Sequence, residues 1–235
     1  MFGLNRFFSG GSVTHRQETG GTRGGYQSDK ASGLSTGLVA GTWVATAIGW
    51  RPVEAIAKGD MVLTFDRGML PVREVTRSRH WQGDTVCPPS LWPLMVPAGA
   101  LGNQEPMALL PEQYVMVESD TADMLFGDPF SLLEAAGLDG FRGIERALPA
   151  DGLEVVQLHF DEDEVVFANA GALVFCPGVR ALDIAAMLDA RDTGTYHVLP
   201  GDEATMLVDC LRDEDAVAGG WTPGPCGGAG YAACA

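Results

Sequence analysis

The middle of the chain consists of short apolar runs that end at turn-forming residues, and this pattern limits the folds open to it. Gly59-Asp60 precedes the run at residues 61–65, and Asp66-Arg67-Gly68 separates that run from residues 71–78, where apolar and polar residues alternate. Further runs of this kind lie at residues 42–47, 94–96, 114–117, 153–160, 164–169 and 172–175. Many short strands with turns between them predict an all-β or mostly β domain.

Two stretches have the features of short helices. Residues 129–137 have a proline near the start and a glycine at the end, which are the residues favoured at the two ends of a helix. Residues 181–190, with the sequence ALDIAAMLDA, also favour a helix. We therefore predict one or two short helices beside the strands.

The charge of the chain is concentrated in its second half. The protein has 15 basic and 31 acidic residues, a net charge of −16, and 21 of those acids lie after residue 118. A surface of this kind repels phosphate, which disfavours nucleic acid and anionic lipid as partners. Solubility, a basic protein partner or divalent cations remain as reasons for the acidity.

Several classes of site and location lack their sequence signals. The five cysteines form no Cys-x-x-Cys pair, so neither a zinc nor a redox motif is supported, and no phosphate-binding loop is present; we expect no cofactor. No apolar run approaches the roughly 18–20 residues that span a bilayer. The N-terminus lacks the apolar core of a cleaved leader, which predicts a cytoplasmic protein or one exported without such a leader.

A set of residues at turns and strand ends forms a recognisable pattern in residues 37–79. Its members are Gly41, Thr42, Thr46, Glu54, Gly59, Asp60 and Asp66. This segment resembles the opening of a Hint domain, the hedgehog/intein autoprocessing module, and in particular the bacterial Hint-domain proteins that begin Cys-Phe-x-x-Gly-Thr. Residues 96–102, 109–117 and 153–171 extend the resemblance. It implies an all-β, horseshoe-shaped domain of two similar halves.

The resemblance also implies a chemistry. In the family, a cysteine at the first position attacks the preceding carbonyl and converts an amide into a thioester. A histidine in a second block assists departure of the amine, which leaves poorly unless it is protonated. Later histidines assist the second step.

This chain departs from the family at each of those positions. The cysteine position, four residues before the Gly-Thr pair, is Gly37, and the second-block histidine position is Gln113. The two later histidine positions are Gln157 and Asp163. Glutamine can donate a hydrogen bond but cannot act as an acid at pH 7. The pattern predicts a scaffold with an emptied active site.

Two alternatives start from residues near these positions. Thr36 precedes Gly37 and is a candidate nucleophile for an N-to-O acyl shift. His159, two residues after Gln157, is a candidate replacement for the family histidine expected at residue 157. Asp161 and Asp163 lie in a run of four carboxylates and are candidate calcium ligands, which would make the chain a calcium-responsive, acidic secreted module. A strand would divide the four carboxylates of this run between two faces, so no metal site is the main expectation.

These observations combine into one prediction of organisation and function. Residues 1–36 form a flexible Gly/Ser/Thr-rich arm, residues 37–180 a Hint-like domain, residues 181–218 an extension packed on or near it, and residues 219–235 a flexible Gly/Cys tail. The predicted function is that of a degenerate Hint-domain protein that does not process itself. It would act as a protein-binding or structural module rather than as an enzyme.

Overall fold

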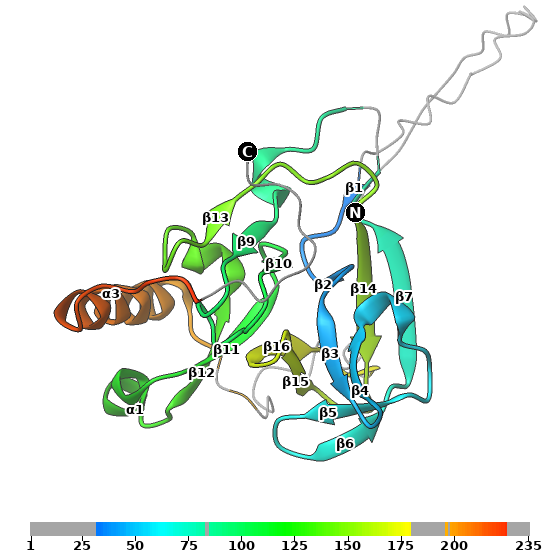
Figure 1. Ribbon diagram of the computed structural model, residues 1–235, viewed down its shortest axis with the longest axis horizontal. Coiled ribbons are helices and arrows are strands. Elements are labelled where there is room, and N and C mark those ends of the chain that lie inside the picture. Colours follow the sequence, from blue (N-terminus) through cyan, green and yellow to red (C-terminus); the bar gives the residue numbers. More distant parts are fainter. Residues whose placement is uncertain (1–31, 83–84, 180–195, 197, 225–235) are drawn as a thin grey trace, which may run out of the picture. The chain divides into compact units, whose positions relative to one another are not determined.

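Strands dominate the structure (Figure 1). The computed structural model describes residues 32–82, 85–179, 196 and 198–224, which lie in one compact unit. The strands are β1 (Ser32–Gly33), β2 (Leu38–Val39), β3 (Trp43–Thr46), β4 (Gly49–Pro52), β5 (Met61–Thr64), β6 (Gly68–Pro71), β7 (Glu74–Arg79), β8 (Trp81–Gln82), β9 (Leu94–Val96), β10 (Met107–Leu109), β11 (Tyr114–Glu118), β12 (Phe130–Glu134), β13 (Glu145–Arg146), β14 (Glu154–His159), β15 (Glu164–Ala168) and β16 (Ala172–Cys176). The helices are α1 (Asp120–Phe126) and α3 (Gly201–Val217), with the 3₁₀ turns η1 (Val53–Ala55), η2 (Pro89–Leu91) and η3 (Ala135–Leu138).

The strands form two larger antiparallel sheets and one small ribbon. One sheet has the order β13-β9-β10-β2-β14-β7. The other has the order β12-β11-β16-β15-β3-β5-β6, with β4 paired to β3, and the ribbon joins β1 to β8. Strand β14 of the first sheet also contacts β16 of the second, so the two sheets meet at that point.

One hydrophobic core unites the two sheets and the C-terminal helix. Inward-facing residues of both sheets belong to it, among them Val44, Val62, Leu94, Val156 and Val174. Helix α3 adds the buried side chains Ala204, Leu207, Val208 and Leu211, whose spacing places them on one helical face. The helix is therefore packed against the β domain by its apolar stripe.

The prediction of a mostly β fold is confirmed. Strand β9 has the predicted bounds, and β3, β5, β11, β14, β15 and β16 coincide with predicted runs to within one or two residues at each end. The run predicted at residues 71–78 is divided, because Pro71 ends β6 and β7 begins at Glu74.

The helix predicted at residues 129–137 is wrong. Residues Phe130–Glu134 form β12, paired along its length with β11, and the following residues form η3. Leu132 and Leu133 point to opposite faces of the strand, and each is buried in a different apolar cluster. A strand can bury both faces in this way, whereas periodicity alone cannot distinguish a short buried strand from a helix.

The two α-helices lie elsewhere in the chain. The Ser119 hydroxyl accepts hydrogen bonds from the backbone N–H groups of Thr121 (3.0 Å) and Ala122 (3.4 Å), and Gly127 at φ 77° ends α1. Helices α1 and α3 pack side by side, away from β5 and β6 (Figure 1). The second predicted helix, residues 181–190, lies outside the described residues.

Candidate functional site

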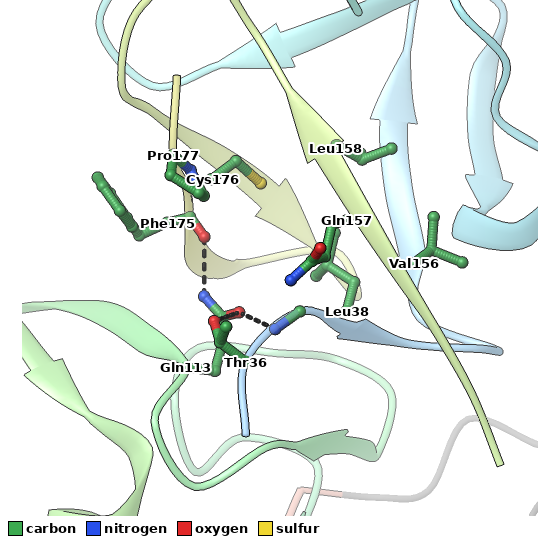
Figure 2. A pocket seen from close by; sticks show the side chains of 10 residues that line it. Thr36, Leu38, Gln113, Val156, Gln157, Leu158, Phe175, Cys176 and Pro177 are labelled. Carbon is green, nitrogen blue, oxygen red and sulfur yellow. Dashed lines mark hydrogen bonds between the residues drawn. The ribbon is translucent and has the colours of Figure 1, made fainter. Parts of the chain in front are cut away.

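A small pocket lies where β2, β14 and β16 meet the turn before β11 (Figure 2). Its volume is about 20 Å³, which is room for about one water molecule. It is lined by Thr36 and by Gly37, Gln113 and Gln157, which are three of the four positions predicted from the sequence to be altered. The fold therefore brings residues from three distant segments to one place.

Gly37 has a backbone conformation and surroundings that disfavour a side chain. Its φ of 118° lies in the region that favours glycine. A Cβ atom on this residue would lie 2.6 Å from Val155 Cγ1 and 3.1 Å from Gln157 Cγ. The first distance is shorter than non-bonded carbon atoms tolerate, so a larger residue would require both a strained backbone and a shift of Val155.

Gln113 is buried, with 2% of its surface exposed, and its carboxamide is fully hydrogen-bonded. The amide oxygen accepts from the backbone N–H of Gly37 (2.9 Å) and the hydroxyl of Thr36 (3.3 Å). The amide nitrogen donates to the carbonyl oxygens of Tyr114 (2.9 Å) and Phe175 (2.8 Å) (Figure 2). Gln113 thus ties the start of the domain to β16 and has no free hydrogen for a substrate.

The two candidate residues on β14 lie on one face of the strand but only one reaches the pocket. The Gln157 side chain points toward Gln113 (Figure 2). His159 is buried and does not line the pocket, and its Nδ1 lies 3.2 Å from the carbonyl oxygen of Pro177. Because a carbonyl can only accept, this contact uses the Nδ1 proton of His159 for a structural bond.

The acidic turn between β14 and β15 lies apart from the pocket, and its carboxylates have separate protein partners. Asp161 pairs with Arg73 at 2.6 Å. Asp163 accepts a hydrogen bond from the backbone N–H of Gly178 at 2.8 Å. The two candidate calcium ligands therefore do not converge, and no group of three His, Cys, Asp or Glu side chains within the described ranges is placed to hold a metal ion.

Cys176 lines the pocket, although the sequence analysis did not name it as a site residue. It is 3% exposed, and burial, with a smaller contribution from the carboxylate of Glu164, raises the pKa of its thiol to about 12. At neutral pH the group is therefore a thiol rather than a thiolate, which is the nucleophilic form. No motif in the sequence marked its position, because its approach to the pocket depends on how β16 lies against β14.

The residues that precede Gly37 are anchored to the segment before β11. The backbone N–H of Glu112 donates to the carbonyl oxygen of Ser35 at 2.7 Å, and the Ser35 hydroxyl donates to the Glu112 carboxylate at 2.5 Å. Together with the contact between Thr36 and Gln113, these bonds hold the peptide group between Ser35 and Thr36 at the mouth of the pocket. The predicted arm boundary at residue 36 falls inside this hydrogen-bonded stretch.

The seven pattern residues support turns and strand ends and do not line the pocket. The Gly41 N–H donates to the Glu54 carboxylate at 2.9 Å. The Asp60 carboxylate accepts from the backbone N–H of Ala57 at 3.0 Å and pairs with Arg51 at 2.9 Å. The remaining members, which lie at turns or strand ends, are Thr42, Thr46, Gly59 and Asp66.

Neither α1 nor α3 has the length and apolar character needed to cross a membrane, and the same holds for every helix in the described part of the chain.

Comparisons with known proteins place these observations in context. A family model described as "Hint domain" matches residues 36–174. Among solved structures, the bacterial intein-like domain from Clostridium thermocellum is 18% identical, with a TM-score of 0.43, and the match covers 60% of this chain and 99% of that one. A glutathione-linked, splice-inactive variant of the AceL NrdHF class 3 split intein is 14% identical, with a TM-score of 0.38 and coverage of 60% and 97%. The gp41-1 intein is 15% identical, with a TM-score of 0.37 and coverage of 59% and 98%. No curated protein matches the chain.

Proposed function

The chain belongs to the Hint-domain family, and on that premise we propose that it is a member that does not process itself and serves as a protein-binding or structural module. The observation that carries the proposal is Gly37. The Hint pattern places a cysteine nucleophile four residues before the Gly41-Thr42 pair, and this chain has there a residue without a side chain, at which a Cβ would lie only 2.6 Å from Val155 Cγ1.

The acid of the reaction is missing as well. Departure of an amine from a peptide requires a proton donor, and the family's histidine position holds Gln113. The Gln113 amide does not titrate at neutral pH, and both of its N–H groups already donate to backbone carbonyls. Loss of nucleophile and acid together removes both halves of the mechanism, because such groups act as a unit.

The pocket contains one thiol that could in principle replace the lost nucleophile. This is Cys176, and its raised pKa keeps it protonated at neutral pH. Its role is therefore that of a small apolar core residue, consistent with its membership of the main hydrophobic core.

The proposal is tested by the intact mass of the freshly expressed full chain, measured with and without added thiol and hydroxylamine. Thiols cleave thioesters, and hydroxylamine cleaves both thioesters and esters. Because the proposal holds that the chain forms neither bond, the expected result is one full-length species that neither reagent changes. A fragment that begins near Thr36 or Gly37 would contradict the proposal.

A second candidate function is residual cleavage at Thr36, favoured by one contact. The Glu112 N–H donates to the Ser35 carbonyl oxygen, which is where negative charge would develop if the Thr36 hydroxyl attacked that carbonyl. The hydroxyl would lose its proton, an ester would form, the amide bond between Ser35 and Thr36 would break, and the freed amine would gain a proton. This candidate predicts a hydroxylamine-sensitive product that disappears in Thr36→Ala and persists in the matched variant Ser35→Ala.

A further inference from the structure

Helices α1 and α3 border a shallow, mainly apolar hollow on the surface. Its volume is about 530 Å³, and Thr121 of α1 faces Cys210 and Val217 of α3 across it. Val217, which lines it, is 90% exposed, and Met124, three residues after the lining Thr121 on α1, is 78% exposed. Exposed apolar groups gathered around a hollow mark a site of interaction more often than scattered ones do.

The exposed side of α3 carries its own apolar stripe. Met206, Cys210, Asp213 and Val217 recur every three or four residues, so they lie along one face of the helix. This face is distinct from the buried stripe, whose members are Ala204, Leu207, Val208 and Leu211. The helix thus has one apolar face in the core and a second apolar face, interrupted by carboxylates, turned to the hollow. We call this hollow and the exposed α1 and α3 residues beside it the α1–α3 groove.

The charges around the α1–α3 groove are almost all of one sign. The two helices together carry eight carboxylates and one basic residue, Arg212. Two of the carboxylates have arginine partners, Asp209 with Arg212 and Asp215 with Arg142. Asp120, Asp123 and Asp213 have no ion pair within the described part of the chain. The groove therefore combines apolar contact area with unneutralised negative charge.

The position of this charge on α3 opposes the stability of the helix. Asp213, Glu214 and Asp215 lie in its last turns, where the backbone carbonyls already give the helix end a partial negative charge. Arg142 compensates Asp215, and the Thr121 hydroxyl donates to Glu214. Asp213 keeps its unfavourable position in the groove wall. Such a local conflict is typical of residues retained for binding rather than for folding.

From these observations we infer that the α1–α3 groove binds a basic, amphipathic segment of another protein. Its apolar side would cover Met124, Met206 and Val217, and its lysines or arginines would pair with Asp123 and Asp213. A second copy of the chain is disfavoured as the occupant, because two such faces would repel each other. The inference rests on the proposed function as a protein-binding module and adds to it the place and the chemistry of the partner.

The test uses the full chain and a synthetic helical peptide with leucine on one face and lysine on the other, measured by fluorescence anisotropy. We expect saturable binding that weakens as salt is raised, because the lysine contacts are partly exposed. Two control peptides separate the contributions, one with glutamate in place of lysine and one with glutamine in place of leucine. Both are expected to bind at least about tenfold more weakly.

Variants of the protein locate the site. The double charge reversal Asp123→Lys with Asp213→Lys is expected to weaken binding about tenfold, since it replaces attraction by repulsion at two points. The double substitution Met124→Ser with Val217→Ser tests the apolar contribution and is expected to weaken binding about fivefold. The matched controls are Asp151→Lys and Ile48→Ser, which alter an exposed acid and an equally exposed apolar residue elsewhere and should change binding less than about twofold.

The outcomes separate this inference from the proposed function. Equal loss of binding in groove and control variants, or equal binding of the glutamine peptide, would overturn the inference, because the attraction would then be general and electrostatic. A chain that sediments as a dimer through this face would also overturn it. A cleaved chain in the mass measurement would instead overturn the proposed function, whatever the peptide does. Circular dichroism of each variant checks that the fold is retained.

Discussion

The pocket at Gly37 and the α1–α3 groove differ in nearly every physical property that bears on function. The pocket has room for about one water molecule and is lined by the buried, fully hydrogen-bonded carboxamide of Gln113. The groove is larger and open, with exposed apolar side chains and carboxylates that lack partners in the described structure. Each region contains one cysteine, Cys176 in the pocket and Cys210 in the groove.

This difference indicates where the chain can still act on another molecule. A polar group that is buried and satisfied contributes to the folded state but offers nothing to a ligand. Exposed apolar surface and unneutralised charge have an unfavourable free energy that a partner can relieve. Under the proposed function, the position that carries chemistry in the family is part of the scaffold here, and the surface with unsatisfied groups lies on the helices.

The largest expected contrast is in the reactivity of the two cysteines. Iodoacetamide should modify Cys210 in the native protein at least about a thousandfold faster than Cys176, because Cys176 reacts only when the core opens and its high pKa keeps it a thiol. Peptide mapping by mass spectrometry after timed quenching measures both rates. Equal rates would mean that the pocket opens readily. Protection of Cys210 alone by the lysine-leucine peptide would sharpen the contrast.

The next effect concerns the stability contributed by Gln113. We expect Gln113→Ala to lower the free energy of unfolding by about 3 kcal/mol, because it leaves Gly37 N–H and the Phe175 carbonyl without their partner and creates a cavity. Urea denaturation followed by circular dichroism gives the value. Gln157→Ala is the matched control and should cost less than about 1 kcal/mol, since the described structure gives its carboxamide no hydrogen bond. Similar losses of unfolding free energy for the two variants would contradict the role of Gln113 in joining the start of the domain to β16.

A third prediction separates backbone strain from steric closure at Gly37. Both Gly37→Ala and Gly49→Ala place a side chain at positive φ, with angles of 118° and 105°. A Cβ at residue 49 has nothing within 4 Å, whereas one at residue 37 meets Val155. We expect a loss of about 1 kcal/mol for Gly49→Ala and about 2–3 kcal/mol for Gly37→Ala, measured by the same denaturation. An equal cost would mean that the pocket has room for a nucleophile after all.

The smallest expected effect concerns the attachment of α3. Arg142 makes two hydrogen bonds to the Asp215 carboxylate, at 2.7 and 2.8 Å, and this lowers the pKa of Asp215 below its ordinary value of 3.8. We expect Arg142→Met to cost about 1 kcal/mol at pH 7, because the pair is partly exposed. Arg212→Met, at an exposed pair on α3 itself, is the control and should cost less.

The pH dependence of the stability lost in Arg142→Met follows from the lowered pKa of Asp215. A lowered pKa in the folded state contributes stability that is present above the unfolded pKa and is lost as the pH falls through the folded pKa. The difference in melting temperature between wild type and Arg142→Met should therefore be constant down to about pH 5 and shrink below pH 4. A difference that persists at pH 2 would show that Arg142 acts through packing rather than through the charge of Asp215.

Much of the β structure could be predicted because it depends on local sequence. Residues 94–96 and the runs around β14 and β15 are apolar and bounded by turn residues, and such runs form strands whichever strand they pair with. The helix predicted at residues 129–137 failed for a non-local reason, since pairing with β11 and burial of both faces override the end signals of Pro129 and Gly137. Helix α3 carries a clear helical stripe, Ala204 to Leu211, that the sequence analysis passed over.

Some residues of the site could likewise be predicted from the sequence, and others could not. Motif spacing identified Gly37, Gln113 and Gln157, and the structure places all three around one pocket. Cys176 could not be found from spacing, because its approach to the pocket depends on how β16 lies against β14. Asp163, chosen by alignment with a family position, lies in the turn between β14 and β15 and bonds the backbone of Gly178.

The sequence by itself determined the strand-rich class of this protein and its resemblance to Hint domains, and it gave the expectation that Gly37 stands at the family's cysteine position, because each of these depends on residue identity and local spacing. Only the tertiary structure decided that a Cβ at residue 37 would meet Val155 and that carboxylates and apolar side chains surround an open groove between α1 and α3. Both depend on distances between residues far apart in the chain. Such distances are set by how strands and helices pack, which no local pattern encodes.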